Sequence, residues 1–174
     1  MLRRFVIISA AVFTAAPAFA IDMPPRKPGQ WEVSMEFVGS KMPAQIIKQC
    51  VDAESDKLMN SHFGGSAQEN CSKKDIQKSA GTMTVDSVCK VGDATVTSHS
   101  VITGSFDSAY TVRVTSKREG GRPVPGMPPG GKMEMTIGAK WLGACAADQK
   151  PGDMIMANGM KVNVFEMPGM PKRP

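Results

Sequence analysis

The residues of this chain whose chemistry is easiest to predict are its four cysteines, Cys50, Cys71, Cys89 and Cys145. In a small exported chain, four cysteines favour two disulfides, and three connectivities exist for them. A four-cysteine zinc site is the alternative, but it needs closely spaced cysteine pairs, and this sequence has none. We therefore expect two disulfides and no free thiol to act as a nucleophile or metal ligand.

The spacing of Cys71 and Cys89 predicts which cysteines pair. Residues 79–81 lie midway between them, and their glycine suits the left-handed position of a three-residue hairpin loop. Such a loop makes Lys78 face Thr82. Pairing outward from there sets the two cysteines directly opposite each other, within disulfide reach.

Two consequences follow from this hairpin register. Lys74 would face Asp86, which is a favourable cross-strand charge pair. Cys50 would remain for Cys145, so that the second disulfide closes most of the domain into one long loop.

Methionine is unusually frequent, with 14 residues, and two pairs recur at strand spacing. Met133 with Met135, and Met154 with Met156, would each place two thioethers on one face of a strand. Thioethers select Cu(I), so methionine-based copper binding is an alternative function. Methionine also fills cores that have few aromatic rings, which is the expectation here, and no cofactor is predicted.

The two histidines, His62 and His99, do not lie in a catalytic motif. The chain has neither the zinc-binding helix motif nor the nucleophile elbow of hydrolases, and no glycine-rich phosphate loop precedes a helix. We therefore expect a protein that is not an enzyme. A hydrolase with an unrecognised site is the third hypothesis.

Residues 1–20 have the order of a secretory signal peptide: a basic start, an apolar run and an Ala-x-Ala cleavage site ending at Ala20. The apolar run is shorter than the roughly 20 residues of a transmembrane helix. These features predict export to the periplasm without a membrane span. The formal net charge of +5 comes from dispersed basic residues without interleaved aromatics, so nucleic acid is not an expected partner.

Alternating apolar and polar residues predict several short strands after the leader. Examples are residues 31–37, 94–103 and 133–141, and a helical turn at 53–60 would be capped by Asp52. This pattern favours an all-β fold, an antiparallel sandwich or up-and-down barrel of about 7–9 strands. A parallel βαβ fold is excluded because crossover helices are lacking.

The chain divides into four parts on this interpretation. The signal peptide covers 1–20, and the disulfide-stapled β domain covers 21–145. A hairpin extension follows at 146–166, where Asn158 and Gly159 would form a two-residue turn with Ile155 facing Val162. The proline-rich tail at 167–174 is expected to be disordered, since it has little to bury.

Aromatic and apolar side chains at alternating positions of the predicted strands would point to one side. They would line either an apolar pocket or an ordinary filled core. The expected partner is a small apolar ligand or another envelope protein. The pocket residues are Trp31, Met35, Phe37, Tyr110, Val112, Met135 and Trp141.

Four segments in order resemble a family of exported bacterial proteins, the domain of unknown function 3617 family. They are residues 28–33, the strand end at Cys50, the hairpin at 71–89 and the closing segment at 140–145. The resemblance covers about residues 28 to 145. It implies an exported β domain with paired cysteines and no known activity, so the leading hypothesis is a non-enzymatic periplasmic binding or interaction module.

Overall fold

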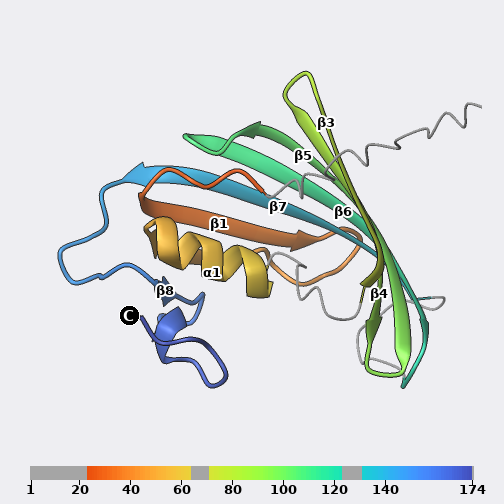
Figure 1. Cartoon of the computed structure of the whole chain (residues 1–174). Helices are drawn as coiled ribbons and strands as arrows, with labels where there is room; N and C mark the ends of the chain where they lie inside the picture. The colour runs from red at the N-terminus through yellow and green to blue at the C-terminus, as the bar shows by residue number, and fades with distance from the viewer. Residues whose placement is uncertain (1–22, 64–70, 123–130, 174) are drawn as a thin grey trace, which may run out of the picture.

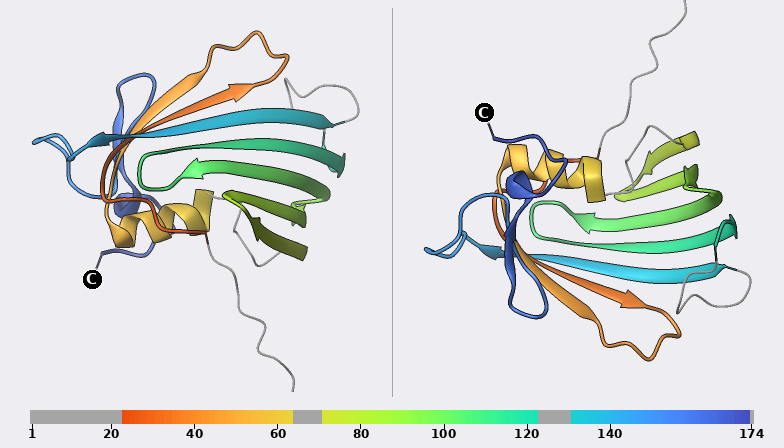
Figure 2. Two further views of the ribbon diagram at one scale, coloured as in Figure 1. Left: turned by 90° about the horizontal axis from the view of Figure 1, so that it is seen from above. Right: turned by 90° about the horizontal axis from the view of Figure 1, so that it is seen from below.

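The computed structural model describes residues 23–63, 71–122 and 131–173, with no side chains for 62 and 63. The predicted signal peptide and its cleavage site lie outside the described residues, as does His62 beyond its backbone. Nine strands form one antiparallel sheet in the order β3-β4-β5-β6-β7-β1-β2-β8-β9 (Figure 1). The sheet curves around the side on which helix α1 lies (Figure 2).

The elements follow one another along the chain with short connections. Their bounds are β1 Gly29–Phe37, β2 Gln45–Val51, α1 Ala53–Phe63, β3 Cys71–Ser79, β4 Thr82–Val91, β5 Ala94–Ser105, β6 Ala109–Gly120, β7 Lys132–Gly143, β8 Asp153–Ile155, β9 Lys161–Asn163 and the 3-10 helix η2 Val164–Glu166.

The prediction of an all-β antiparallel fold with two disulfides is confirmed. The strands do not divide into the two stacked sheets of a sandwich: they form one open sheet whose edges are β3 and β9. The consecutive strands β3 to β7 are joined as neighbours, and β7 then pairs with β1. Beyond β1 the order continues with β2, β8 and β9, so β9 is the edge strand on the side away from the cysteine hairpin.

Helix α1 begins at the predicted cap. The Asp52 carboxylate accepts hydrogen bonds from the backbone N and the hydroxyl of Ser55 at 2.9 and 2.7 Å. Partial burial opposes ionisation of Asp52, but the bonds from Ser55 and the nearby Arg173 guanidinium outweigh it and lower the pKa of this carboxyl. The helix runs on to Phe63, further than the turn expected from the sequence.

The main core lies between α1 and one face of the sheet. Trp31 is completely buried there, and Leu58 and Met59 of the helix pack against the same cluster. Trp31 and Val33 of β1 both point into this core, and burial of a large aromatic side chain removes much apolar surface from water. We call this covered side of the sheet the inner face, and the opposite side the outer face.

Both predicted disulfides are present. Cys50 bonds to Cys145 over a sequence separation of 95, and Cys71 bonds to Cys89 over a separation of 18. The cysteines of the second pair face each other directly across β3 and β4.

The predicted register inside the cysteine hairpin is wrong by one residue. Ser79 faces Thr82, so Ala80 and Gly81 form a two-residue turn, and both have positive φ, at 41° and 81°. A bulge between Cys71 and Lys73 inserts one extra residue and restores the pairing of the cysteines. The hairpin therefore reaches the predicted disulfide by a different route.

The predicted charge pair in this hairpin does not form, for the same reason. Lys74 faces Ser87, and Asp86 faces Asp75 instead. A shift of one residue moves every side chain to the other face of a strand, so Lys74 lies on the inner face and Asp86 on the outer face.

The C-terminal hairpin differs in the opposite sense. Lys161 is the partner of Ile155, and the Met156 backbone N donates to the Met160 carbonyl, so residues 157–159 form a three-residue loop. Gly159 takes the left-handed conformation in it. The predicted pairing of Ile155 with Val162 is therefore wrong by one residue.

The segment after Cys145 is part of the same sheet, because β8 pairs with the free edge of β2. We expected residues 167–174 to be disordered because they have little to bury. In the structure Met167 and Met170 instead pack against the main core, and Arg173 bonds to Asp52 at 3.0 Å.

Candidate functional site

The inner face continues well beyond the helix as two rows of side chains that cross the sheet from strand to strand. We call them the apolar rows, because Ser100 is the single polar member of the two; the first row ends on β4, since the β3 partner of Met83 is Lys78. The strand pairings place these side chains next to one another. The first row is Met83, Ile102, Val112, Ile137 and Met35, and the second is Ile76, Val85, Ser100, Val114, Met135 and Phe37.

The apolar rows differ in how far they are covered. Met83 and Ile102 are buried, with 5% and 3% of their surfaces exposed. The remaining apolar members, including Val112 and Val114, stay half-buried. A strip of neighbouring apolar side chains that stay partly exposed is suited to an apolar ligand or partner.

All seven residues predicted to line a pocket lie on the inner face. They fall into two groups, and Met35, which is also a member of the first apolar row, lies where the two groups meet. Trp31 is fully buried and Tyr110, Met35 and Trp141 pack against its cluster, so these residues belong to the closed core. The other three are half-buried members of the apolar rows, on β1, β6 and β7: Phe37, Val112 and Met135.

A buried ion pair lies at the end of the inner face that α1 covers, and it connects the helix to the N-terminal segment. The Arg26 backbone N and Nε donate to the two carboxylate oxygens of Asp56 at 2.9 and 2.6 Å, and Nη1 donates to Gln49 Oε1 at 2.7 Å. The side chains are 5% and 1% exposed. The pair therefore joins the N-terminal segment, helix α1 and strand β2 at one point.

Aromatic rings surround this ion pair. The Arg26 guanidinium lies 5.8 Å from the centre of the Trp31 ring, which is 5.8 Å from the ring of Tyr110. Burial raises the pKa of the Tyr110 phenol; the Arg26 charge opposes this rise and the Asp56 charge adds to it. The phenol is therefore neutral across the physiological pH range.

The N-terminal segment is held over the second tryptophan of the core. Trp31 Nε1 donates to the Lys27 carbonyl at 2.8 Å, and Trp141 Nε1 donates to the Pro28 carbonyl at 3.1 Å. The Lys27 ammonium lies 3.7 Å from the centre of the Trp141 ring. These contacts account for the extended, proline-rich lead-in before β1.

The two methionine pairs do not come together. Met133 and Met135 lie on the inner face of β7, while Met154 is buried beside the main core and Met156 begins the turn after β8. Met154 belongs to the row of Trp141, eight residues along β7 from Met133, which corresponds to roughly 26 Å of strand. Within the described residues no group of three or more His, Cys, Asp or Glu could hold a metal ion either.

His99 lies on the outer face, and its Nδ1 is 2.8 Å from Asp86 Oδ1. Both side chains are about half exposed, at 51% and 42%. On the outer face His99 lies between Asp86 and Thr115 of the neighbouring strands, with Thr97 and Val101 on either side of it along β5.

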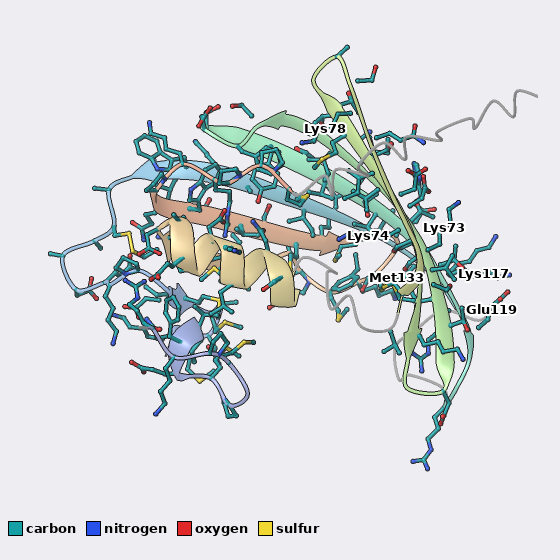
Figure 3. The ribbon with its side chains drawn as sticks, in the orientation of Figure 1. Lys73, Lys74, Lys78, Lys117, Glu119 and Met133 are labelled. Atoms are coloured by element: carbon teal, nitrogen blue, oxygen red, sulfur yellow. A yellow bond between two sulfur atoms is a disulfide. The ribbon has the colours of Figure 1, made fainter. Side chains whose placement is uncertain are left out.

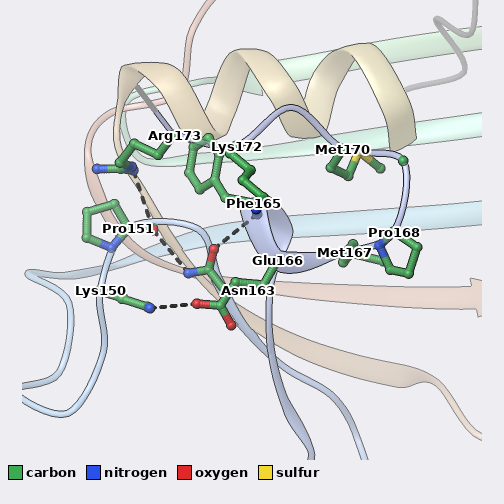
Figure 4. Close-up of a pocket in the computed structure, with 11 residues that line it drawn as sticks. Lys150, Pro151, Asn163, Phe165, Glu166, Met167, Pro168, Met170, Lys172 and Arg173 are labelled. Atoms are coloured by element: carbon green, nitrogen blue, oxygen red, sulfur yellow. Dashed lines mark hydrogen bonds and ion pairs between the residues drawn. The ribbon is translucent and has the colours of Figure 1, made fainter.

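A hollow of about 720 Å³ lies at the C-terminal end (Figure 4). Three of its four charged lining residues have polar partners. Lys150 Nζ donates to Glu166 at 2.8 Å, and Arg173, which lies 4.6 Å from the Phe165 ring centre, bonds to Asp52. These contacts fasten the tail to the domain, which makes a structural role the simplest one for this hollow.

Two parts of this arrangement are absent from the sequence-based set. Seven members of the apolar rows were not in the predicted set, and the strand alternation that identified their neighbours was the available signal. They are Ile76, Met83, Val85, Ser100, Ile102, Val114 and Ile137. Arg26 and Asp56 lie 30 residues apart, one in a proline-rich lead-in and one in a helix, so no local pattern links them.

A family model described as "Protein of unknown function (DUF3617)" matches residues 26–145. The chain belongs to this family. The match begins at Arg26 and ends at Cys145, so it contains the buried ion pair, both disulfides and the apolar rows. No curated protein and no solved structure is similar enough to the chain to count as a match.

Proposed function

We propose that this DUF3617 protein is an exported, non-enzymatic binding module of the cell envelope that holds an apolar ligand on the open part of its inner face. The observation that carries the proposal is the half-buried state of the apolar rows beyond α1, on β4, β6, β7 and β1. Contact between water and so many neighbouring apolar side chains is unfavourable in free energy, and a bound apolar molecule would remove it.

Export is supported by the two disulfides, because such bonds persist in oxidising compartments. Among the described helices none has the length and apolar character needed to cross a membrane. The non-enzymatic part of the proposal is supported by the cysteines, all of which are paired. His99, the one histidine whose side chain is described, is exposed on the outer face of the sheet.

The test is a change of one apolar row. Val114→Asp places a carboxylate among apolar side chains, where it opposes entry of an apolar molecule because a charge is costly to bury. We expect the affinity for the neutral fluorescent probe N-phenyl-1-naphthylamine to fall at least about tenfold, which corresponds to about 1.4 kcal/mol. Fluorescence titration of the purified mature protein measures it.

The matched control is Thr115→Asp, the next residue of β6, which introduces the same charge on the exposed outer face. This variant should bind the probe as the unmodified protein does, and urea unfolding of both variants shows that they remain folded. An unmodified protein that does not bind the probe, or equal losses in the two variants, would contradict the proposal.

A further inference from the structure

The inner face changes from apolar to polar along its strands. One step beyond the apolar rows, a third row consists of Ser87, Ser98 and Ser116, followed on β7 by Met133. The hydroxyls of Ser87 and Ser98 lie 2.7 Å apart. Ser116 is buried and its hydroxyl faces the Met133 carbonyl at 3.5 Å. We call these three residues the serine row.

Two cations lie next to the serine row, and a third inner-face cation, Lys78, lies opposite Met83 at the β3 end of the first apolar row. Lys74 is the partner of Ser87 on β3, and Arg118 follows Ser116 by two residues on β6, so that both side chains share the inner face. Arg118 is half-buried. In Figure 3, Lys74 and Met133 lie on the inner side of the curved sheet, whereas Lys73, Lys117 and Glu119 lie on its outer side.

The acidic residues of the same strands all take the opposite face. In the described parts of β1 and β3 to β7, the register leaves no aspartate or glutamate on the inner face. The outer face carries Glu32, Glu36, Asp75, Asp86, Glu119 and Glu134. The inner face therefore combines an apolar floor with a purely positive set of charges, while the outer face is mixed.

We propose that the ligand is an anionic amphiphile with a single hydrocarbon chain. Its chain lies along the apolar rows, and its head group lies at the serine row, where hydroxyls and the Arg118 guanidinium donate hydrogen bonds to an anion. This inference rests on the proposed function, since it gives the chemical class of the molecule that the inner face binds.

Dimensions agree with a single chain. The second apolar row crosses six strands and the first crosses five. Because neighbouring strands are about 4.8 Å apart, the rows are about 24 Å and about 19 Å long. Two rows side by side make a narrow strip, and one hydrocarbon chain can lie along it with apolar side chains on both sides. A cationic head group would instead meet charges of its own sign.

The experiment compares two amphiphiles with the same twelve-carbon chain, laurate and dodecyltrimethylammonium, each below its micelle concentration. Isothermal titration calorimetry on the mature protein measures both affinities. Laurate should bind at least about tenfold more tightly, because hydrogen bonds to a charged group contribute more than neutral ones. The preference should shrink as salt is added.

Charge reversal locates the head group. The double variant Lys74→Glu with Arg118→Glu should lose the preference for laurate. Its matched control, Lys73→Glu with Arg113→Glu, reverses the same charges on the outer faces of the same two strands and should keep it. Urea unfolding verifies that both double variants are folded.

The outcomes separate the two proposals. If both amphiphiles bind the unmodified protein equally, or if the preference survives in the inner-face variant, the anionic class or its location is overturned while apolar binding stands. If neither amphiphile nor the neutral naphthylamine probe binds, the proposed function itself fails.

Discussion

Arg26 and Asp56 form the only ion pair among the described residues with both side chains almost fully buried. A buried pair is weak evidence of net stabilisation, because both charges have lost their hydration. Replacing only one of the two residues is strongly destabilising, because the charge of the other residue then lies in the protein interior without a partner. This asymmetry makes the pair a sensitive test of how α1 is held against the sheet.

We expect Asp56→Asn to lower the free energy of unfolding by about 3–5 kcal/mol, because it leaves the buried Arg26 charge uncompensated. Urea unfolding followed by tryptophan fluorescence measures the change, and Trp31 next to the pair is a suitable reporter. The replacement keeps the size and shape of the side chain. It removes the negative charge and one of the two oxygens that accept hydrogen bonds from Arg26.

The control for this prediction is Glu54→Gln on the same helix. Glu54 is exposed and its contact with Arg173 is 3.8 Å long, so its contribution should stay below about 1 kcal/mol. A midpoint for Asp56→Asn equal to that of the control would show that the pair does not hold the helix.

At the scale of elements, the cysteine hairpin contains a two-residue turn, Ala80 and Gly81, which differs from the three-residue loop predicted from the sequence. Ala80 is the one described non-glycine residue with positive φ. This conformation costs an alanine about 1–2 kcal/mol, whereas asparagine adopts it more readily because its side chain can form local hydrogen bonds. Asn-Gly is the favoured pair for such two-residue turns.

Ala80→Asn should therefore stabilise the domain by about 0.5–1 kcal/mol. Thermal unfolding with the disulfide intact measures the gain. In the three-residue loop expected from the sequence, residue 80 would have an ordinary helical conformation, and the replacement would bring no benefit. An unchanged melting temperature would thus favour that loop.

On the scale of the whole molecule, the two disulfides constrain very different lengths of chain. In the loop-entropy description, closing a loop of about 100 residues contributes about 4.7 kcal/mol, and a loop of about 15 residues contributes about 3 kcal/mol. The bond between Cys50 and Cys145 spans 95 residues and connects β2 to the segment after β7.

Replacing Cys50 and Cys145 by alanine should therefore destabilise the protein more than replacing Cys71 and Cys89, by about 1–2 kcal/mol. Urea unfolding of the two double variants compares them directly. The complete burial of Cys50 acts in the same direction, since alanine leaves a gap there. A larger loss from the hairpin variant would show that native-state contacts outweigh the loop term.

Much of the fold could be predicted because its determinants are local. Alternation of apolar and polar residues assigned the strands, and the spacing of Cys71 and Cys89 predicted their disulfide despite the wrong loop. The two hairpin registers were missed because a loop of two or three residues and a bulge can compensate for each other, and no single residue near 80 or 158 decides between them.

The candidate site was predicted in part. The alternation placed Phe37, Val112 and Met135 on the correct side of the sheet. It also placed there residues such as Trp31, which are part of the closed core. It could not separate the two groups, because a strand pattern gives the face of a side chain and not what covers that face.

The sequence by itself therefore determined the strands, their inward side and the cysteine pairs, since each depends on residues close in the chain or on a symmetric spacing. Only the tertiary structure decided that α1 and the C-terminal segment cover one end of the inner face, and that Arg26 meets Asp56 there. These contacts join segments far apart in sequence, and their geometry depends on the twist of the whole sheet.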